Sequence, residues 1–140
     1  MNQANQTLEF ASHPGNLAMM REFVRSFLAP MAFTEGETDL MVLGIDEACT
    51  NIIRYAYDHE HTHPITLTCE KDNGCVTFRL RDMGKQCDPA KLCGRALDDV
   101  RPGGLGIHLI KKAFDSVDYV LKEKGTELVL SKKLGAAKAS

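Results

Sequence analysis

The stretch Asp46-Glu47-Ala48-Cys49-Thr50-Asn51 lies within the longest helical pattern of this 140-residue chain. The apolar residues around it recur on one helix face; they are Ile45, Cys49, Ile52, Ile53 and Ala56. Four polar residues fall roughly opposite: Glu47, Thr50, Asn51 and Arg54. The pattern predicts a helix over residues 35–57, which begins at a capping box between Thr34 and Glu37.

Alternation of apolar and polar residues predicts five strands on either side of this helix. They cover residues 7–11, 65–69, 76–80, 117–122 and 126–131. Helical spacing predicts two further helices, from about 12 to 30 and from about 104 to 114. The inner face of the first of these carries Leu17, Met20, Val24, Phe27 and Leu28.

The order of these elements predicts an α+β fold. Strands joined by short turns pair antiparallel, and three helices on one face of a mostly antiparallel sheet give a two-layer sandwich. We expect a single domain over residues 1–140. Residues 83–103 break the pattern with glycine, proline, cysteine and charge, which is typical of a lid over a binding site. The polar tail, residues 135–140, is expected to fray.

Composition argues against several classes of protein. The formal net charge is −2 and the basic residues are scattered, so we expect no direct contact with nucleic acid. No apolar run reaches the roughly 20 residues of a membrane span, and the polar start is unlike a signal peptide. We therefore expect a cytoplasmic protein with no membrane partner. The five cysteines lack paired spacing, which favours reduced thiols.

Glu47 and Asn51 lie four residues apart and therefore stack on one helix face. A carboxylate can accept a proton from a hydroxyl group, and an amide oxygen can ligate a hard cation. The alternative interpretation is that both residues belong to the solvated side of an amphipathic helix.

Asp82 ends an apolar strand and Gly84 follows two residues later. A carboxylate at this point could accept a hydrogen bond from an exocyclic amine, such as that of adenine, and would disfavour the carbonyl of guanine. Glycine lets the backbone approach a ligand closely. An ordinary turn at a strand end is the alternative.

The segment Gly103-Gly104-Leu105-Gly106 precedes the last expected helix, where free N–H groups and the helix dipole suit a phosphate. Arg101 stands just before it and could meet the phosphate charge. The lysine and hydroxyl of a P-loop are missing, so a plain helix start is the alternative. A transition-metal site is a separate possibility. It would use His59, His61 and His63.

With these segments placed, the chain resembles the GHKL ATPases, whose nucleotide-binding domain is the Bergerat, or histidine-kinase-like, fold. More narrowly, it resembles the anti-sigma factor serine/threonine-protein kinases of bacterial partner switching. The boxes that carry the resemblance are Asp46–Asn51 with Tyr55-Ala56-Tyr57, Asp82-Met83-Gly84, Arg101-Pro102-Gly103-Gly104-Leu105-Gly106 and Gly125-Thr126. In one departure, Lys85-Gln86 occupy the region where many relatives have a second glycine.

The resemblance implies a role for each residue of the boxes. Glu47 would be the general base on a substrate serine, and Asn51 would ligate Mg²⁺ bound to ATP. The adenine end would be bound by Asp82, Gly84 and Thr126. The phosphates would be held by Gly104, Gly106 and Arg101, under the lid.

The resemblance also implies partners and an activity. The protein would bind a sigma factor and phosphorylate an anti-anti-sigma antagonist, and relatives are often homodimers. The first helix offers a candidate partner or dimer surface, which comprises Met19, Met20, Arg21 and Arg25. Methionines suit adaptable interfaces, but they suit cores as well. The alternative function is a nucleotide-gated protein-binding switch without kinase activity.

Overall fold

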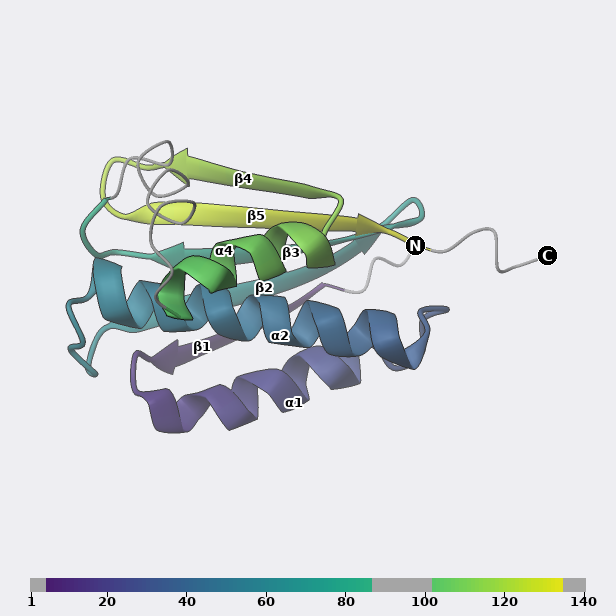
Figure 1. The fold of residues 1–140 in the computed structure, drawn as a ribbon, viewed down its shortest axis with the longest axis horizontal. Helices are drawn as coiled ribbons and strands as arrows, with labels where there is room; N and C mark the ends of the chain where they lie inside the picture. The colour runs from purple at the N-terminus through teal and green to yellow at the C-terminus, as the bar shows by residue number, and fades with distance from the viewer. Residues whose placement is uncertain (1–4, 87–101, 135–140) are drawn as a thin grey trace.

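The computed structural model describes residues 5–86 and 102–134, with the backbone alone for residues 102–107. The strands are β1 Gln6–Ala11, β2 Pro64–Asp72, β3 Cys75–Asp82, β4 Ser116–Leu121 and β5 Thr126–Lys133 (Figure 1). The helices are α1 Leu17–Leu28, α2 Glu35–Asn51 and α4 Pro102–Ala113, with a 3-10 turn at Pro14–Asn16 and a π-helical turn at Ile52–Ala56. All the predicted strands and helices are present, in the predicted order.

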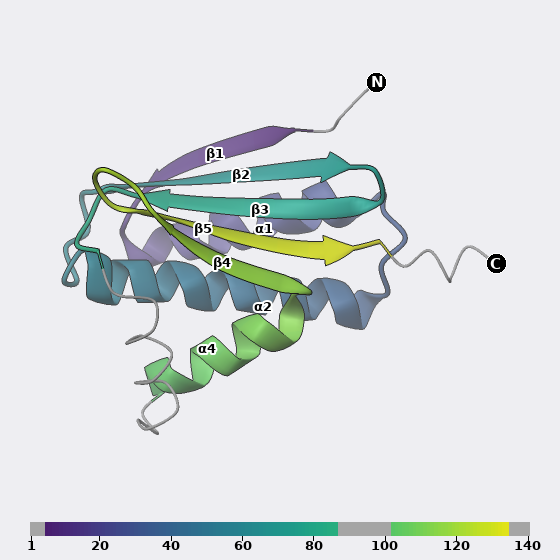
Figure 2. The same cartoon turned by 90° about the horizontal axis from the view of Figure 1, so that it is seen from above.

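The five strands form one antiparallel sheet in the order β1-β2-β3-β5-β4. Figure 2 shows that α1, α2 and α4 all cover the same face of this sheet. The predicted two-layer α+β sandwich is therefore confirmed. Within the described residues, no helix has the length and apolar character needed to cross a membrane.

The core lies between the sheet and the helices. Phe78 on β3 contacts Phe27 on α1 and Phe114 after α4 edge to face, with both pairs of ring centroids 5.9 Å apart. All five residues predicted for the inner face of α1 are buried. One of these is Met20, which has no exposed surface. Its inclusion in the candidate partner surface was therefore wrong, whereas Met19 is 46% exposed.

Helix α2 begins at the predicted capping box, where Glu37 N donates to Thr34 Oγ1 at 3.0 Å and Thr34 N donates to Glu37 Oε1 at 2.8 Å. The prediction of one regular helix to residue 57 was wrong at the C-terminal end. After Asn51 the chain continues as a π-helical turn, in which Tyr57 N donates to Ile52 O at 3.0 Å. Such turns are frequent at functional sites.

Helix α4 starts at Pro102, so the glycine-rich segment forms its first turns instead of a loop before it. Gly44 lets α2 approach α4 closely, because an added Cβ would lie only 3.2 Å from Ala113 Cβ. Figures 1 and 2 place the start of α4 at the same end of the molecule as the end of α2. Most of the predicted lid, Arg101 and the tail 135–140 lie outside the described residues.

Candidate functional site

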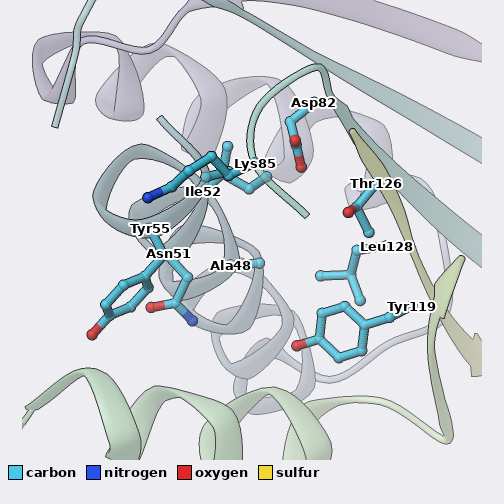
Figure 3. A pocket seen from close by; sticks show the side chains of 10 residues that line it. Ala48, Asn51, Ile52, Tyr55, Asp82, Lys85, Tyr119, Thr126 and Leu128 are labelled. Carbon is cyan, nitrogen blue, oxygen red and sulfur yellow. The ribbon is translucent and has the colours of Figure 1, made fainter. Parts of the chain in front are cut away.

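A cavity opens where the C-terminal end of α2 meets the end of β3 and the hairpin of β4 and β5 (Figure 3). Its lining residues are Ala48, Asn51, Ile52, Tyr55, Ala56, Asp82, Lys85, Tyr119, Thr126 and Leu128. Three predicted site residues are among them, although they come from distant parts of the chain. These three are Asn51, Asp82 and Thr126.

Asn51 lines the cavity and carries a polar side-chain atom without a partner among the described residues. Its Oδ1 is buried and has no hydrogen-bond partner among the described residues. A buried acceptor without a partner costs about 1–3 kcal/mol, so native proteins rarely keep one without a reason. A hard amide oxygen of this kind is a ligand that Mg²⁺ accepts. The residue present therefore fits a magnesium ion carried by a nucleotide.

Asp82 is a buried carboxylate at the opposite side of the cavity, only 4% exposed. Its Oδ1 accepts a hydrogen bond from Gly84 N at 2.9 Å. Burial is the largest influence on the Asp82 pKa and raises it, while the backbone N–H groups of Gly84 and Thr126 and the charge of Arg81 oppose the shift. A buried carboxylate that faces a cavity is suited to accept hydrogen bonds from an amine.

Thr126 stands beside Asp82 because the two residues pair across β3 and β5. Figure 3 shows the Thr126 hydroxyl and the Asp82 carboxylate on the same side of the cavity. The wall next to Thr126 is apolar and aromatic, since Leu128 and Tyr119 pair across β5 and β4. A flat heteroaromatic base with an exocyclic amine would match this combination of apolar wall and polar edge.

Glu47 lies one helical turn before Asn51 and is not among the cavity-lining residues. Burial raises its pKa most, the neighbouring Asp46 raises it further, and Arg54 lowers it. Asp46 itself is held by Arg21 Nη1 at 2.6 Å. A carboxylate with a raised pKa is a stronger proton acceptor near neutral pH, as a general base requires.

Gly84 packs closely against the protein's own helix end. A Cβ at this position would lie 2.4 Å from Ala56 O and 2.8 Å from Tyr57 Cδ1. This contact alone requires a glycine here, and the predicted approach of Gly84 to a ligand stays a prediction. Lys85 N completes this contact by donating to Ala56 O at 2.8 Å.

The backbone of Gly104 and Gly106 lies in the first turns of α4. The first N–H groups of an α-helix have no partner within the helix, so they remain available to an anion. The N–H of Gly104 is one of these groups, whereas Gly106 is the fifth residue of α4 and its N–H has its acceptor within the helix. The predicted phosphate role of the two glycines stays a prediction. Arg101, the cation expected beside them, lies outside the described residues.

The predicted histidine loop is built around other contacts. His63 Nε2 lies 2.6 Å from Glu60 Oε1, and its ring stacks on Tyr57 with centroids 4.7 Å apart. His61 contacts His13 edge to face. Among residues 5–86 and 102–134 no group of three side chains that could hold a metal ion is found.

Several residues that shape the site are not among the predicted site residues. Tyr55, Lys85 and Tyr119 line the cavity. Gln86 contacts the β4–β5 turn, and the Tyr57 hydroxyl contacts both Met83 and Pro64. Strand alternation could have found Tyr119, because it shares a face with Val117; the other contacts depend on the tertiary fold.

Comparison with known proteins agrees with this geometry. The model of the histidine kinase-like ATPase domain family matches residues 10–132. The serine/threonine-protein kinase BtrW of Bordetella bronchiseptica is 30% identical over 95 residues, which cover 65% of this chain and 67% of BtrW. An anti-sigma F factor of Clostridium beijerinckii is 27% identical over 138 residues, which cover 95% of this chain and 96% of that protein.

A solved structure shares the fold. The crystal structure of the RsbU and RsbW domains of a Mycobacterium tuberculosis protein superposes with a TM-score of 0.67 at 16% identity. The match covers 94% of this chain but only 32% of that one, so the chain spans about a third of that protein's resolved length.

Proposed function

The chain belongs to the histidine kinase-like ATPase family, and we propose that it is an anti-sigma factor that binds Mg-ATP and phosphorylates a serine on its anti-anti-sigma antagonist. Two relatives support this proposal by their names, since one is an anti-sigma F factor and the other a serine/threonine-protein kinase. The activity would release or capture a sigma factor by partner switching.

The observation that carries the proposal is the unpartnered Oδ1 of Asn51, a residue that lines the same cavity as the buried carboxylate of Asp82. Bound ATP would supply the phosphoryl group, with Mg²⁺ neutralising its charge. Asn51 would ligate that ion, Asp82 would accept the adenine amine, and Thr126 would complete the adenine end. Gly84 packs against Ala56 and Tyr57 and so brings the segment after Asp82 close to the end of the π-helical turn.

At the phosphate end, the first turn of α4 would offer the backbone N–H of Gly104, and Gly106, without a side chain, would leave room for the phosphate beside it. Arg101 and the lid are assigned there by resemblance. Glu47 would act as the catalytic residue that accepts the proton of the substrate serine. Its raised pKa supports this role.

Phosphorylation adds nearly two negative charges to the antagonist serine, which would weaken its contact with the kinase by charge repulsion. The exposed Met19 on α1 is one candidate contact for a partner. Arg21 and Arg25 lie on a different side of α1 and are paired with Asp46 and Asp39 at 2.6 and 2.7 Å. A cytoplasmic location belongs to the same proposal, because sigma factors act in the cytoplasm. A homodimer is proposed as well, by resemblance to the family.

The test combines nucleotide binding with phosphate transfer. Thermal unfolding with Mg-ATP, Mg-GTP and no nucleotide should show selective stabilisation by ATP, about 2.7 kcal/mol at 100 times the dissociation constant. With Mg-ATP and the antagonist, the wild type should transfer phosphate to serine and Glu47→Ala should lose about 10²-fold or more in rate while it keeps ATP binding. A wild type that binds ATP, regulates its partner and never transfers phosphate would instead be a nucleotide-gated switch.

A further inference from the structure

We propose that Tyr57 is a positioning residue for adenine recognition, because its hydroxyl fixes the backbone that carries the Asp82 carboxylate. The inference rests on the proposed function, in which Asp82 accepts the adenine amine. No pattern in the sequence singled out this hydroxyl, and Tyr57 does not line the cavity itself.

The hydroxyl of Tyr57 is buried and makes two hydrogen bonds. It donates to Pro64 O at 2.6 Å and accepts from Met83 N at 2.7 Å. Tyr57 is only 5% exposed. Burial raises the pKa of the phenol, so it remains protonated and can be donor and acceptor at once. The hydroxyl thus joins the start of β2 to the residue that follows Asp82.

The position of this bridge in the sheet explains its effect. The pairing of β2 with β3 ends at Ile65 and Asp82. Beyond this pair the two strands are connected through the Tyr57 hydroxyl, which lies between Pro64 O and Met83 N. The direction in which the chain leaves β3, and with it the orientation of Asp82, is therefore set by a side chain of the helical layer.

Two further contacts tie the same segment to the end of α2. Lys85 N donates to Ala56 O at 2.8 Å, and Gly84 lies so close to Ala56 that it has no room for a Cβ. Gly84 N in turn donates to Asp82 Oδ1 at 2.9 Å. Loss of the Tyr57 hydroxyl would leave the Met83 N–H without this acceptor and loosen the residue between Asp82 and Gly84.

This arrangement also links the two ends of the nucleotide. Asn51 is the last residue of α2, and Tyr57 is the C-cap of the π-helical turn that directly follows α2. The segment would therefore place the magnesium ligand directly and the adenine acceptor through Tyr57. Tyr57 N donates to Ile52 O at the end of the π-helical turn, so this turn fixes the position of the Tyr57 backbone.

Tyr57→Phe isolates the hydroxyl, because the ring that stacks on His63 is kept. The matched control is Ser12→Ala. Ser12 is fully buried, and its Oγ also makes two hydrogen bonds, to Glu60 O at 2.6 Å and from His63 N at 3.1 Å. Both substitutions therefore remove a buried hydroxyl near the same loop, but only Tyr57 contacts the Asp82 segment.

The measurement is the dissociation constant of Mg-ATP and of Mg-ITP, whose base has a carbonyl in place of the adenine amine. We expect Tyr57→Phe to weaken ATP binding about tenfold, one hydrogen bond's worth in free energy, and ITP binding less than twofold. The preference for ATP would then fall. Ser12→Ala should lower the melting temperature and leave the preference for ATP unchanged. If the role of Tyr57 were purely structural, Tyr57→Phe would give the same result as Ser12→Ala.

Two results would overturn the inference, and they are distinguishable. A wild type without preference for ATP over ITP would remove the adenine role of Asp82, on which the inference rests, while phosphate transfer to the antagonist would still decide the proposed kinase activity. A wild type that prefers ATP, together with a Tyr57→Phe variant of equal preference, would remove only the role of Tyr57. If the variant does not fold, amide exchange in the wild type decides: the inference requires a Met83 N–H protected from exchange, and a freely exchanging one contradicts it.

Discussion

Gln86 Nε2 lies 2.7 Å from the carbonyl oxygen of Gly125, in the turn between β4 and β5. The same nitrogen also donates to Lys122 O. Gly125 adopts a φ of +75°, and a Cβ there would overlap the carbonyl oxygen of Asp82. The turn that leads into Thr126 therefore lies directly against the end of β3, and the Gln86 amide adds a side-chain contact to the pairing of β3 with β5.

Gln86→Glu should loosen this turn, because a carboxylate cannot donate and would face two carbonyl oxygens. We expect a loss of about 1 kcal/mol in the free energy of unfolding and three- to tenfold weaker ATP binding. Lys124→Gln is the control, since it makes the same charge change in the same turn. Equal ATP affinities of the two variants, measured by calorimetry, would show that the Gln86 contact does not matter.

Asp82→Asn should stabilise the protein while it weakens ATP binding. The pKa of Asp82 is raised, mainly by burial, so the folded state disfavours the charged form. This cost is absent below the ordinary aspartate pKa of about 4 and fully present above the raised pKa. At pH 7 we therefore expect a gain of about 1 kcal/mol, or roughly 3 °C in melting temperature, that vanishes on acidification below pH 4. A variant less stable than the wild type at pH 7 would contradict this.

Gly84→Ala should damage both stability and nucleotide binding. The added Cβ would lie 2.4 Å from Ala56 O, a backbone atom that cannot yield as a flexible side chain can. We expect a loss of about 2 kcal/mol or more in a thermal or urea unfolding experiment. The matched control is Gly36→Ala in the first turn of α2, where the nearest heavy atom to the new Cβ is Thr34 Oγ1 at 4.0 Å. This control should be neutral or gain a few tenths of a kcal/mol, and equal losses in both variants would argue against the contact.

The rate of phosphate transfer should fall on acidification through the raised pKa of Glu47, because the protonated form cannot accept the serine proton. Asp46→Asn removes a like charge, lowers the pKa of Glu47 and should move the acid limb of the profile to lower pH. Arg54→Met removes the cation that lowers this pKa and should move the limb to higher pH. Profiles that shift in the same direction, or not at all, would mean that another group titrates.

Much of the fold follows from local patterns in the sequence. The five inner residues of α1 were predicted by helical spacing alone, and all are buried. The capping box of Thr34 and Glu37 is likewise local, and so is the turn at Asn73 and Gly74, which both adopt positive φ. These features depend on residues within one helical turn or hairpin of each other, so the sequence displays them directly.

The rest depends on contacts that the sequence does not display. The π-helical turn keeps the apolar spacing of an α-helix over residues 52–56, so periodicity could not reveal it. The packing of Gly84 on Ala56 and the double contact of Gln86 join residues about 30 to 40 positions apart. Asn51 and Asp82, which line the cavity, were predicted from their chemistry. Tyr57 was not, because its hydroxyl contacts the backbone of Met83 and does not line the cavity.

A crystal structure with a non-hydrolysable Mg-ATP analogue tests the central claim most directly. The account predicts the magnesium ion about 2.1 Å from Asn51 Oδ1 and the adenine amine within hydrogen-bond distance of the Asp82 carboxylate. A nucleotide bound elsewhere, with Asn51 Oδ1 still unpartnered and Asp82 facing no base, would contradict the account.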